Sequence, residues 1–338
     1  MTTSATRTRV DPAALAAGVR RGERASVARL LSLVESGEEA ARAAVALLAA
    51  DGGRAYTIGI TGAPGVGKSS LTDRLVGVLR SFGDSVSVLA VDPSSPRSGG
   101  AILGDRVRMG AHATDPGVFI RSMATRGQLG GLAAAARQAI RVLDASGTPW
   151  IVVETVGVGQ VEIDIAGAAD TTAVVVSPGW GDGIQANKAG LLEIADVFVV
   201  NKADRAGADA AVKDLAAMLA LAPSAPWTPP IVTTVATKGE GVDRLWEAIG
   251  AHRGYLVDSG ELERRRGERA RTEIRELVKA HLVRLAEECC RGPRFEAIVH
   301  EQTREVFDAQ RVAEQVVAEA LGTQPIRFDH ASKRPATR

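Results

Sequence analysis

The sequence contains few cysteines, few aromatic residues and almost no excess of charge of either sign. Only two of its 338 residues are cysteines, Cys289 and Cys290, and these neighbours cannot join distant segments by disulfides. Aromatic residues make up 4% of the chain, so platforms on which nucleic-acid bases could stack are scarce. The formal net charge of +1 provides no general attraction to nucleic acid or anionic lipid. We therefore expect a reducing environment and no nucleic-acid partner.

Long apolar segments are missing as well. No run approaches the roughly 18 apolar residues needed for a membrane-spanning helix, and no apolar region follows the arginines of residues 1–10. We therefore expect a cytoplasmic protein without a membrane partner. The hydrophobic content of 45% and charged content of 24% are ordinary for a globular protein. The chain is long enough for one large domain with appendages, or for two domains.

A glycine-rich segment near residue 65 carries the first strong motif, which fits the pattern G-x-x-x-x-G-K-[ST]. Residues 55–60 before it favour a strand, and residues 70–79 after it favour a helix with one apolar face. In that setting, backbone N–H groups and the helix N-terminus bind phosphate. We expect Lys68 to reach the β- and γ-phosphates and the Ser69 hydroxyl to ligate Mg²⁺. The predicted phosphate site consists of Gly62, Ala63, Pro64, Gly65, Val66, Gly67, Lys68, Ser69 and Ser70.

A second motif, Asn201-Lys202-Ala203-Asp204, follows an apolar run and fits the guanine-reading N-K-x-D box. The carboxylate of Asp204 can accept hydrogen bonds from guanine N1–H and N2–H₂, a donor pair that adenine does not offer. We expect Asn201 and Lys202 to brace the base and the neighbouring loop. Ala236 and Thr237 follow a later predicted strand, where GTPases place a loop whose backbone N–H contacts guanine O6. The two motifs together predict GTP rather than ATP.

Acidic residues after predicted strands suggest a magnesium site, because Mg²⁺ prefers hard oxygen ligands. Asp92 and Glu154 each end an apolar run, and Asp105 lies in the glycine- and proline-rich loop after Asp92. Glu154 also opens the segment E-T-V-G, where many GTPases carry D-x-x-G and the N–H of the glycine, here Gly157, senses the γ-phosphate. Ordinary surface aspartates remain the alternative for Asp92 and Asp105. The candidate metal ligands are Ser69, Asp92, Asp105 and Glu154, and the candidate catalytic residues are Lys68, Asp105, Glu154 and Gly157.

The water-orienting glutamine of Ras-like GTPases has no counterpart at the usual spacing. Gln160 lies three residues beyond Gly157, which is the wrong distance for that role. Completion of the site by a partner protein is one way to supply the missing group.

Apolar runs alternate with helical patterns between residues 54 and 256. This order predicts an α/β fold of the P-loop NTPase class, with a mostly parallel sheet covered by helices on both faces. Ligands of such sheets bind at the carboxyl ends of the strands, where the motifs above fall. The predicted strands are 56–60, 86–91, 118–121, 150–154, 173–176, 197–200 and 231–234, and the predicted helices are 71–82, 128–146, 185–195, 206–222 and 242–253.

Helical extensions are predicted on both sides of this domain. Residues 1–53 form an N-terminal helical extension with breaks at Ser36-Gly37 and at residues 51–53, and residues 257–338 form a C-terminal helical arm and tail. The arm carries an apolar stripe that starts at Ile274 and ends at Leu285. Packing of this stripe onto the nucleotide domain and dimerisation through it are equally compatible with the sequence.

Taken in order, four segments resemble the MeaB/ArgK family of P-loop GTPases, which includes the human methylmalonic aciduria type A protein. They are G-A-P-G-V-G-K-S-S, V-D-P-S-S-P-R-S-G-G-A-I-L-G-D-R, V-E-T-V-G-V-G-Q and N-K-A-D, and the resemblance spans about residues 20–320. It implies a GTP-hydrolysing chaperone for an adenosylcobalamin-dependent acyl-CoA mutase, usually methylmalonyl-CoA mutase. Such proteins gate cofactor delivery, protect or reactivate the mutase, are stimulated by it, and form homodimers through their C-terminal helices.

The loop 177–188 resembles the third switch of that family, in which Asp182, Gln185 and Lys188 would relay mutase binding to the nucleotide. The family pattern is commonly G-D-E-L-Q-G-I-K-K-G, whereas residues 181–190 read G-D-G-I-Q-A-N-K-A-G. One acidic residue and one lysine are therefore absent, which leaves the identity of the partner mutase open.

Two other functions are weighed against this interpretation. An older label of the family is a kinase or ATPase linked to amino-acid transport, but the Asn201–Asp204 box argues against ATP. A metal-insertion GTPase for nickel would need histidine-rich or Cys/His sites, and the sequence shows no such spacing.

Overall fold

The structure is a computed structural model that describes residues 10–92, 110–112, 114–124, 131–155, 167–179, 193–302 and 309–321. The chain divides into two compact units, residues 1–271 and residues 272–338.

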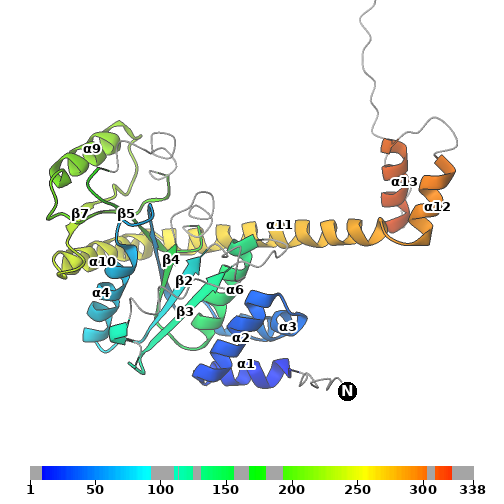
Figure 1. Cartoon of the computed structure of the whole chain (residues 1–338), viewed down its shortest axis with the longest axis horizontal. Coiled ribbons are helices and arrows are strands. Elements are labelled where there is room, and N and C mark those ends of the chain that lie inside the picture. Colours follow the sequence, from blue (N-terminus) through cyan, green and yellow to red (C-terminus); the bar gives the residue numbers. More distant parts are fainter. Residues whose placement is uncertain are drawn as a thin grey trace, which may run out of the picture. The chain divides into compact units, whose positions relative to one another are not determined.

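Seven parallel strands form the centre of the first unit, in the order β3-β2-β4-β1-β5-β6-β7 (Figure 1). All residues of β1, β4 and β5 are buried, as expected for a parallel sheet that is covered on both faces. The predicted α/β fold with a parallel sheet is therefore confirmed. The strands are β1 (Tyr56–Thr61), β2 (Val86–Asp92), β3 (Val118–Ala124), β4 (Trp150–Thr155), β5 (Thr171–Val176), β6 (Val197–Asn201) and β7 (Ile231–Thr234).

Helices cover both faces of this sheet (Figure 1). On one face, α4 (Lys68–Ser81) and α10 (Val242–Asp258) pack on side chains such as Ile58, Val88 and Val199. On the other face, α6 (Gly131–Ala145) packs on β2 and β4, and α9 (Ala208–Leu221) packs on β6 and β7. A short 3₁₀ turn, η2 (Gly110–His112), lies against α4.

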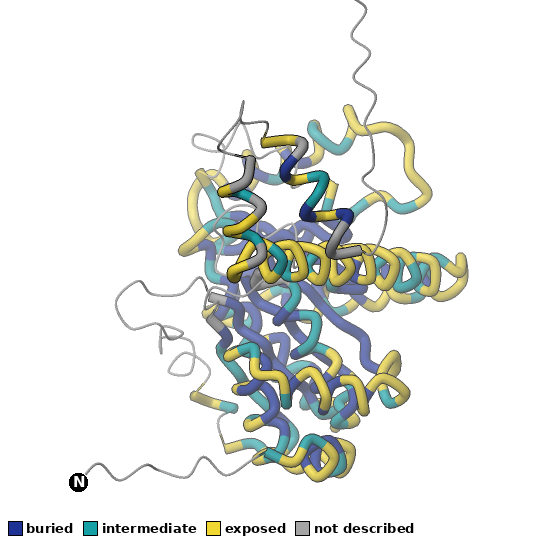
Figure 2. Tube along the Cα trace, turned by 90° about the vertical axis from the view of Figure 1, so that its right-hand side faces the viewer, coloured by how far each residue is buried: buried dark blue, intermediate teal, exposed yellow. Residues whose placement is uncertain are grey.

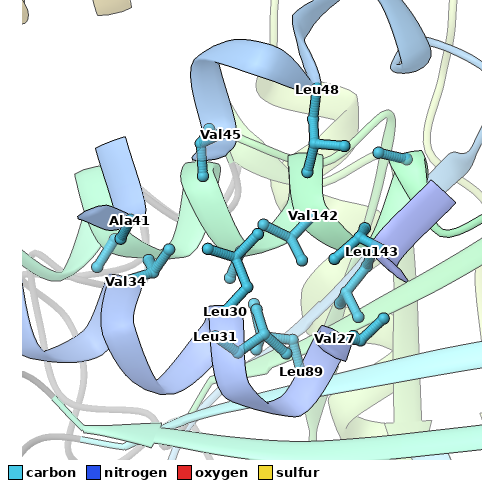
Figure 3. Close-up of a cluster of buried hydrophobic side chains, with 14 of the residues drawn as sticks. Val27, Leu30, Leu31, Val34, Ala41, Val45, Leu48, Leu89, Val142 and Leu143 are labelled. Atoms are coloured by element: carbon cyan, nitrogen blue, oxygen red, sulfur yellow. The ribbon is translucent and has the colours of Figure 1, made fainter. Parts of the chain in front are cut away.

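Three N-terminal helices share a core with α6. These helices, α1 (Pro12–Arg20), α2 (Arg24–Ser36) and α3 (Glu39–Leu47), are followed by the 3₁₀ turn η1 (Ala49–Asp51). Leu30 and Leu31 of α2 are fully buried among Val142, Leu143 and Leu89 (Figure 3). The N-terminal extension therefore belongs to the same compact unit as the sheet.

The predicted helix break at Ser36-Gly37 is present, because Gly37 adopts a left-handed conformation with φ of 70°. Apolar spacing did not predict the break between α1 and α2. There the chain turns at Gly22, which has φ of 69°. Asp11 caps α1 by accepting a hydrogen bond of 2.9 Å from the Ala13 N–H, and Pro12 begins the helix.

Arginines in the first turns of α11 (Glu261–Cys289) hold two aspartates at the amino ends of β5 and β6. Asp170 accepts from Arg266 at 2.6 Å and also pairs with Arg269, while Asp196 pairs with Arg265 at 2.9 Å. Asp170 and Asp196 are both buried, so these ion pairs compensate charges that would be costly to bury alone. We call this group the arginine clasp.

The second unit consists of helical segments. It contains the later part of α11, α12 (Pro293–Gln302) and α13 (Ala309–Leu321). The helices α12 and α13 pack on each other. Much of α11 is exposed, as the yellow stretches of its tube show (Figure 2). The large apolar residues exposed in this part of the helix are Ile274, Leu277, Val278, Leu282, Val283 and Leu285. Among the helices that the structure describes, none is long and apolar enough to cross a membrane.

Candidate functional site

The glycine-rich loop joins the end of β1 to the start of α4. Gly62, Gly65 and Gly67 have φ angles of 139°, 77° and 99°, which side chains rarely tolerate. A Cβ atom on Gly62 would lie 2.0 Å from the Val175 carbonyl oxygen, and one on Gly67 would lie 2.3 Å from Asn201 Nδ2. Glycine is therefore required at the first and last of these positions by close neighbours as well as by conformation.

Lys68 and Ser69, the first two residues of α4, are buried at the base of the loop. Lys68 Nζ donates to the carbonyl oxygens of Gly62 (2.6 Å) and Ala63 (3.0 Å), which holds the ammonium inside the loop. Ser69 Oγ donates to Glu154 Oε1 at 2.6 Å. Pro64 and Ser70 complete the loop and the first turn of the helix. The N-terminus of α4, a lysine and a hydroxyl group thus converge where the sequence predicted phosphate binding.

Glu154 is a buried carboxylate near the carboxyl end of β4. Its contact with Ser69 places a hydroxyl and a carboxylate oxygen side by side, which is the donor chemistry that suits Mg²⁺. The β2–β4 pairing sets Val91 opposite Thr155, so the backbone of Asp92 ends its strand at this same edge. Within the described part of the chain, no group of three or more His, Cys, Asp or Glu side chains is placed to hold a metal ion.

Asn201 connects the phosphate loop to the base-recognition segments. It is buried at the end of β6, and its Nδ2 donates to the Val66 carbonyl oxygen at 2.8 Å. Its Oδ1 accepts from the Ala236 N–H at 3.0 Å and from Thr234 Oγ1 at 3.1 Å. One side-chain amide therefore joins the loop after β1, the end of β6 and the loop after β7.

The other two residues of the N-K-x-D box lie beside Asn201. Lys202 has φ of 59° and donates from Nζ to the Gly65 carbonyl oxygen at 2.6 Å, which adds a second link to the phosphate loop. Asp204 has a side chain that is 42% exposed and lies 3.8 Å from Lys238 Nζ. Its carboxylate is therefore accessible to a base.

The sequence model of the family described as methylmalonyl-CoA mutase-associated GTPase MeaB matches residues 27–290. The chain belongs to this family. It is 48% identical over 308 residues to a protein of Pyrococcus abyssi named as a GTPase, covering 90% of this chain and 95% of that protein. It is 36% identical over 289 residues to the GTPase ArgK of Escherichia coli, covering 81% of this chain and 87% of ArgK.

Two further similarities extend this comparison. The mouse methylmalonic aciduria type A homolog, a mitochondrial protein, is 34% identical over 268 residues, which cover 74% of this chain and 65% of that protein. A crystal structure named as an LAO/AO transport system kinase aligns with a TM-score of 0.68 and 25% identity, covering 94% of this chain and 100% of that one. The P-loop NTPase fold predicted from the sequence is shared with that structure.

In this MeaB-family chain, four of the predicted elements meet at one edge of the sheet. They are the phosphate loop after β1, Glu154 of β4, the N-K-x-D box after β6, and Ala236 and Thr237 after β7. Other predicted residues lie outside the described part of the chain; they are Asp105, Gly157, Asp182, Gln185, Lys188 and the side chain of Asp92.

Sequence reasoning missed three contacts at this edge. Thr155 Oγ1 donates to Thr61 Oγ1 at 2.9 Å and so ties the ends of β4 and β1 together. Arg74 binds the loop after β7 across 162 positions of sequence. Lys238, in contact with Asp204, was the only one with a local signal, because it closes the segment 235–238 that follows β7.

Proposed function

We propose that this MeaB-family protein is a Mg²⁺-dependent GTPase that serves as a chaperone for an adenosylcobalamin-dependent acyl-CoA mutase, with methylmalonyl-CoA mutase as the leading partner. The observation that supports a guanine nucleotide is the pair of hydrogen bonds by which the Asn201 side chain links the loop after β1 to the loop after β7. Because one buried amide binds both Val66 and Ala236, the phosphate loop and the guanine box form a single preorganised unit. Such a unit suits GTP and GDP, which require both contacts at once.

The described side chains have definite tasks in this proposal. The Lys68 ammonium exchanges its two loop carbonyls for β- and γ-phosphate oxygens, and the N–H groups at the start of α4 bind the same phosphates. Ser69 and Glu154, with Asp92 and Asp105, would hold Mg²⁺, which neutralises charge on the phosphates when bound. Asp204 accepts hydrogen bonds from guanine. Glu154 is a candidate for ordering the attacking water. The N–H of Gly157 is a candidate for sensing the γ-phosphate.

Several observations support a protein partner. The family description names methylmalonyl-CoA mutase, and the mouse relative carries the name of methylmalonic aciduria. Gln160 has the wrong spacing to act as a built-in catalytic glutamine, and a partner protein is one source of the missing group. In this proposal Asp182, Gln185 and Lys188 of the loop 177–188 carry the signal between mutase and nucleotide. The protein thereby gates cofactor delivery and protects or reactivates the mutase in the cytoplasm.

Nucleotide hydrolysis with and without a mutase tests this function. We expect the purified full-length protein with Mg²⁺ to hydrolyse GTP slowly, to hydrolyse ATP far more slowly, and to be accelerated by methylmalonyl-CoA mutase. Removal of Mg²⁺ with a chelator should stop hydrolysis. ATP use with phosphate transfer to a protein, and no GTP use, would instead support a kinase.

The assignment of Asp204 is tested by Asp204→Asn. An amide presents a donor where the carboxylate accepts, so preference should shift from GTP towards xanthosine triphosphate. Loss of two hydrogen bonds should weaken GTP binding about a hundredfold, measured by calorimetry. Asp209→Asn, at an exposed position in the first turn of α9, is the control and should bind GTP normally. Unchanged GTP affinity in Asp204→Asn would refute the assignment.

A further inference from the structure

The loop after β7 uses most of its N–H groups internally. The Ala236 N–H donates to Asn201 Oδ1 at 3.0 Å, the Lys238 N–H donates to the Val235 carbonyl oxygen at 2.9 Å, and the Val235 N–H is also bonded. The Thr237 N–H donates to no group among the residues that the structure describes, and Thr237 is exposed. The Thr237 N–H therefore remains available for a ligand.

Arg74, on the solvent side of α4, holds the same loop from the phosphate-binding helix. Its Nε donates to the Ala236 carbonyl oxygen at 3.2 Å and its Nη2 donates to the Thr237 carbonyl oxygen at 3.1 Å. The Ala236 carbonyl oxygen also accepts from the Gly239 N–H at 3.2 Å. A planar guanidinium that binds two successive carbonyls fixes their orientation better than a single donor would.

The hydrogen bond from Arg74 to the Ala236 carbonyl oxygen determines where the Thr237 N–H points. The Ala236 carbonyl and the Thr237 N–H belong to one planar trans peptide group, so they point in opposite directions. Holding the carbonyl towards Arg74 therefore directs the N–H away from Arg74. A cationic donor on the carbonyl oxygen also polarises the peptide and makes its N–H a stronger donor.

We propose that Arg74 is a positioning residue that aims the Thr237 N–H at O6 of the bound guanine and thereby sets the preference for a base with a carbonyl group at C6. This inference rests on the proposed binding of GTP and GDP. The two edges of the base are then read by separate elements: the Thr237 peptide, set by α4, reads O6, and Asp204 reads N1–H and the N2 amino group. Arg74 itself does not touch the nucleotide.

Three diphosphates separate these two recognition events. GDP carries O6, the N1–H and the N2 amino group, whereas IDP lacks only the N2 amino group. The 2-aminopurine riboside diphosphate keeps the N2 amino group but lacks O6 and the N1–H, and the missing N1–H affects the wild-type protein and an Arg74 variant alike. Dissociation constants for all three should be measured by calorimetry on the full-length protein and on Arg74→Met. We expect Arg74→Met to reduce the preference for GDP over the 2-aminopurine nucleotide about tenfold, as for the loss of one hydrogen bond. The preference for GDP over IDP should stay at the wild-type value.

Arg244→Met is the matched control, because Arg244 of α10 binds the carbonyl oxygen and hydroxyl of Thr233 in β7 rather than the loop. It should leave both preferences unchanged. If Arg74→Met does not fold, Arg74→Lys provides the same test, since lysine keeps the charge but cannot bind both carbonyls in the plane of a guanidinium. If a folded Arg74 variant keeps the wild-type ratio of GDP affinity to 2-aminopurine nucleotide affinity, the role of Arg74 is refuted. The proposal that the protein binds GTP and GDP is unaffected by that result. Equal affinity of the wild-type protein for GDP and ADP would overturn both the role of Arg74 and the proposed preference for guanine nucleotides.

Discussion

At the scale of single residues, the strictest requirement in the phosphate loop falls on Gly62. Its φ angle of 139° and its approach to the β5 backbone leave no room for a methyl group, since a Cβ atom would lie 2.0 Å from the Val175 carbonyl oxygen. Gly62→Ala should therefore lower the free energy of unfolding by at least about 3 kcal/mol, measured by urea denaturation.

Gly250→Ala is a suitable comparison for that experiment. Gly250 lies within α10, its Cβ would meet nothing within 4 Å, and its φ is not positive. This variant should be as stable as the wild-type protein or more stable by up to about 1 kcal/mol, because alanine favours a helix over glycine. Equal stability of Gly62→Ala and Gly250→Ala would show that the loop shifts to accept a side chain.

The residues of the phosphate loop and the guanine box could be named from the sequence because each motif is contiguous. The contacts between these two groups of residues could not be predicted from the sequence. Asn201 was expected to brace the base and the neighbouring loop, and the structure adds its bond to Val66, which is 135 positions away. Arg74 gave no signal at all, because an exposed arginine on a helix is ordinary and its partners are backbone carbonyls distant in sequence.

At the scale of elements, buried parallel strands were predictable because they are nearly continuous apolar runs. β5 is instructive, since it begins at Thr171, two residues before the predicted start. Thr171 is polar yet fully buried, because its hydroxyl bonds the Tyr56 hydroxyl at 2.6 Å and His252 Nδ1 at 2.8 Å. Burial also raises the pKa of Tyr56 to about 12. A threonine satisfied by distant partners has no signature in the local pattern.

The arginine clasp should make the stability of the sheet sensitive to acid. Burial alone would raise the pKa of Asp170, but the hydrogen bond from Arg266 and the charges of Arg269 and Arg266 outweigh it, so the pKa is lowered. The pKa of Asp196 is lowered for similar reasons by His252 and Arg265. A carboxyl group with a lowered folded-state pKa contributes stability that is present above its unfolded pKa of about 3.9. That stability is lost as pH falls through the folded-state value.

We therefore expect the free energy of unfolding to fall as the pH drops below about 4, measured by urea denaturation at each pH. Asp170→Asn should lower it at pH 6 by about 3 kcal/mol, because two arginines lose their partner, and should reduce its dependence on pH. The exposed Asp258 provides a control, since Asp258→Asn should change neither quantity. A pH dependence in Asp170→Asn as steep as in the wild-type protein would exclude Asp170 as a source of it.

At the scale of the whole molecule, the sequence left two uses for the apolar stripe of the C-terminal arm. The N-terminal extension packs its apolar residues into the core around α6, so that Leu30 and Leu31 are fully buried. The α11 side chains behave differently: Val278 is 52% exposed and Leu282 is 54% exposed. A continuous row of exposed apolar side chains on one helix is typical of a surface that another chain covers. A second copy of the same chain is the partner implied by the family resemblance.

We therefore predict that the protein is a homodimer formed through this face of α11. Sedimentation equilibrium should give twice the chain mass of 35.2 kDa for the wild-type protein, and Leu282→Arg should reduce it to the mass of one chain. Basal GTP hydrolysis per chain should persist in the variant, because the arginine clasp and the nucleotide site lie in the first unit. Leu221→Arg introduces the same charge at a leucine that is 87% exposed at the end of α9, and it should leave the dimer intact. Monomeric wild-type protein at all concentrations, or a dimer that survives both Leu282→Arg and Val278→Asp, would show that this face has another role.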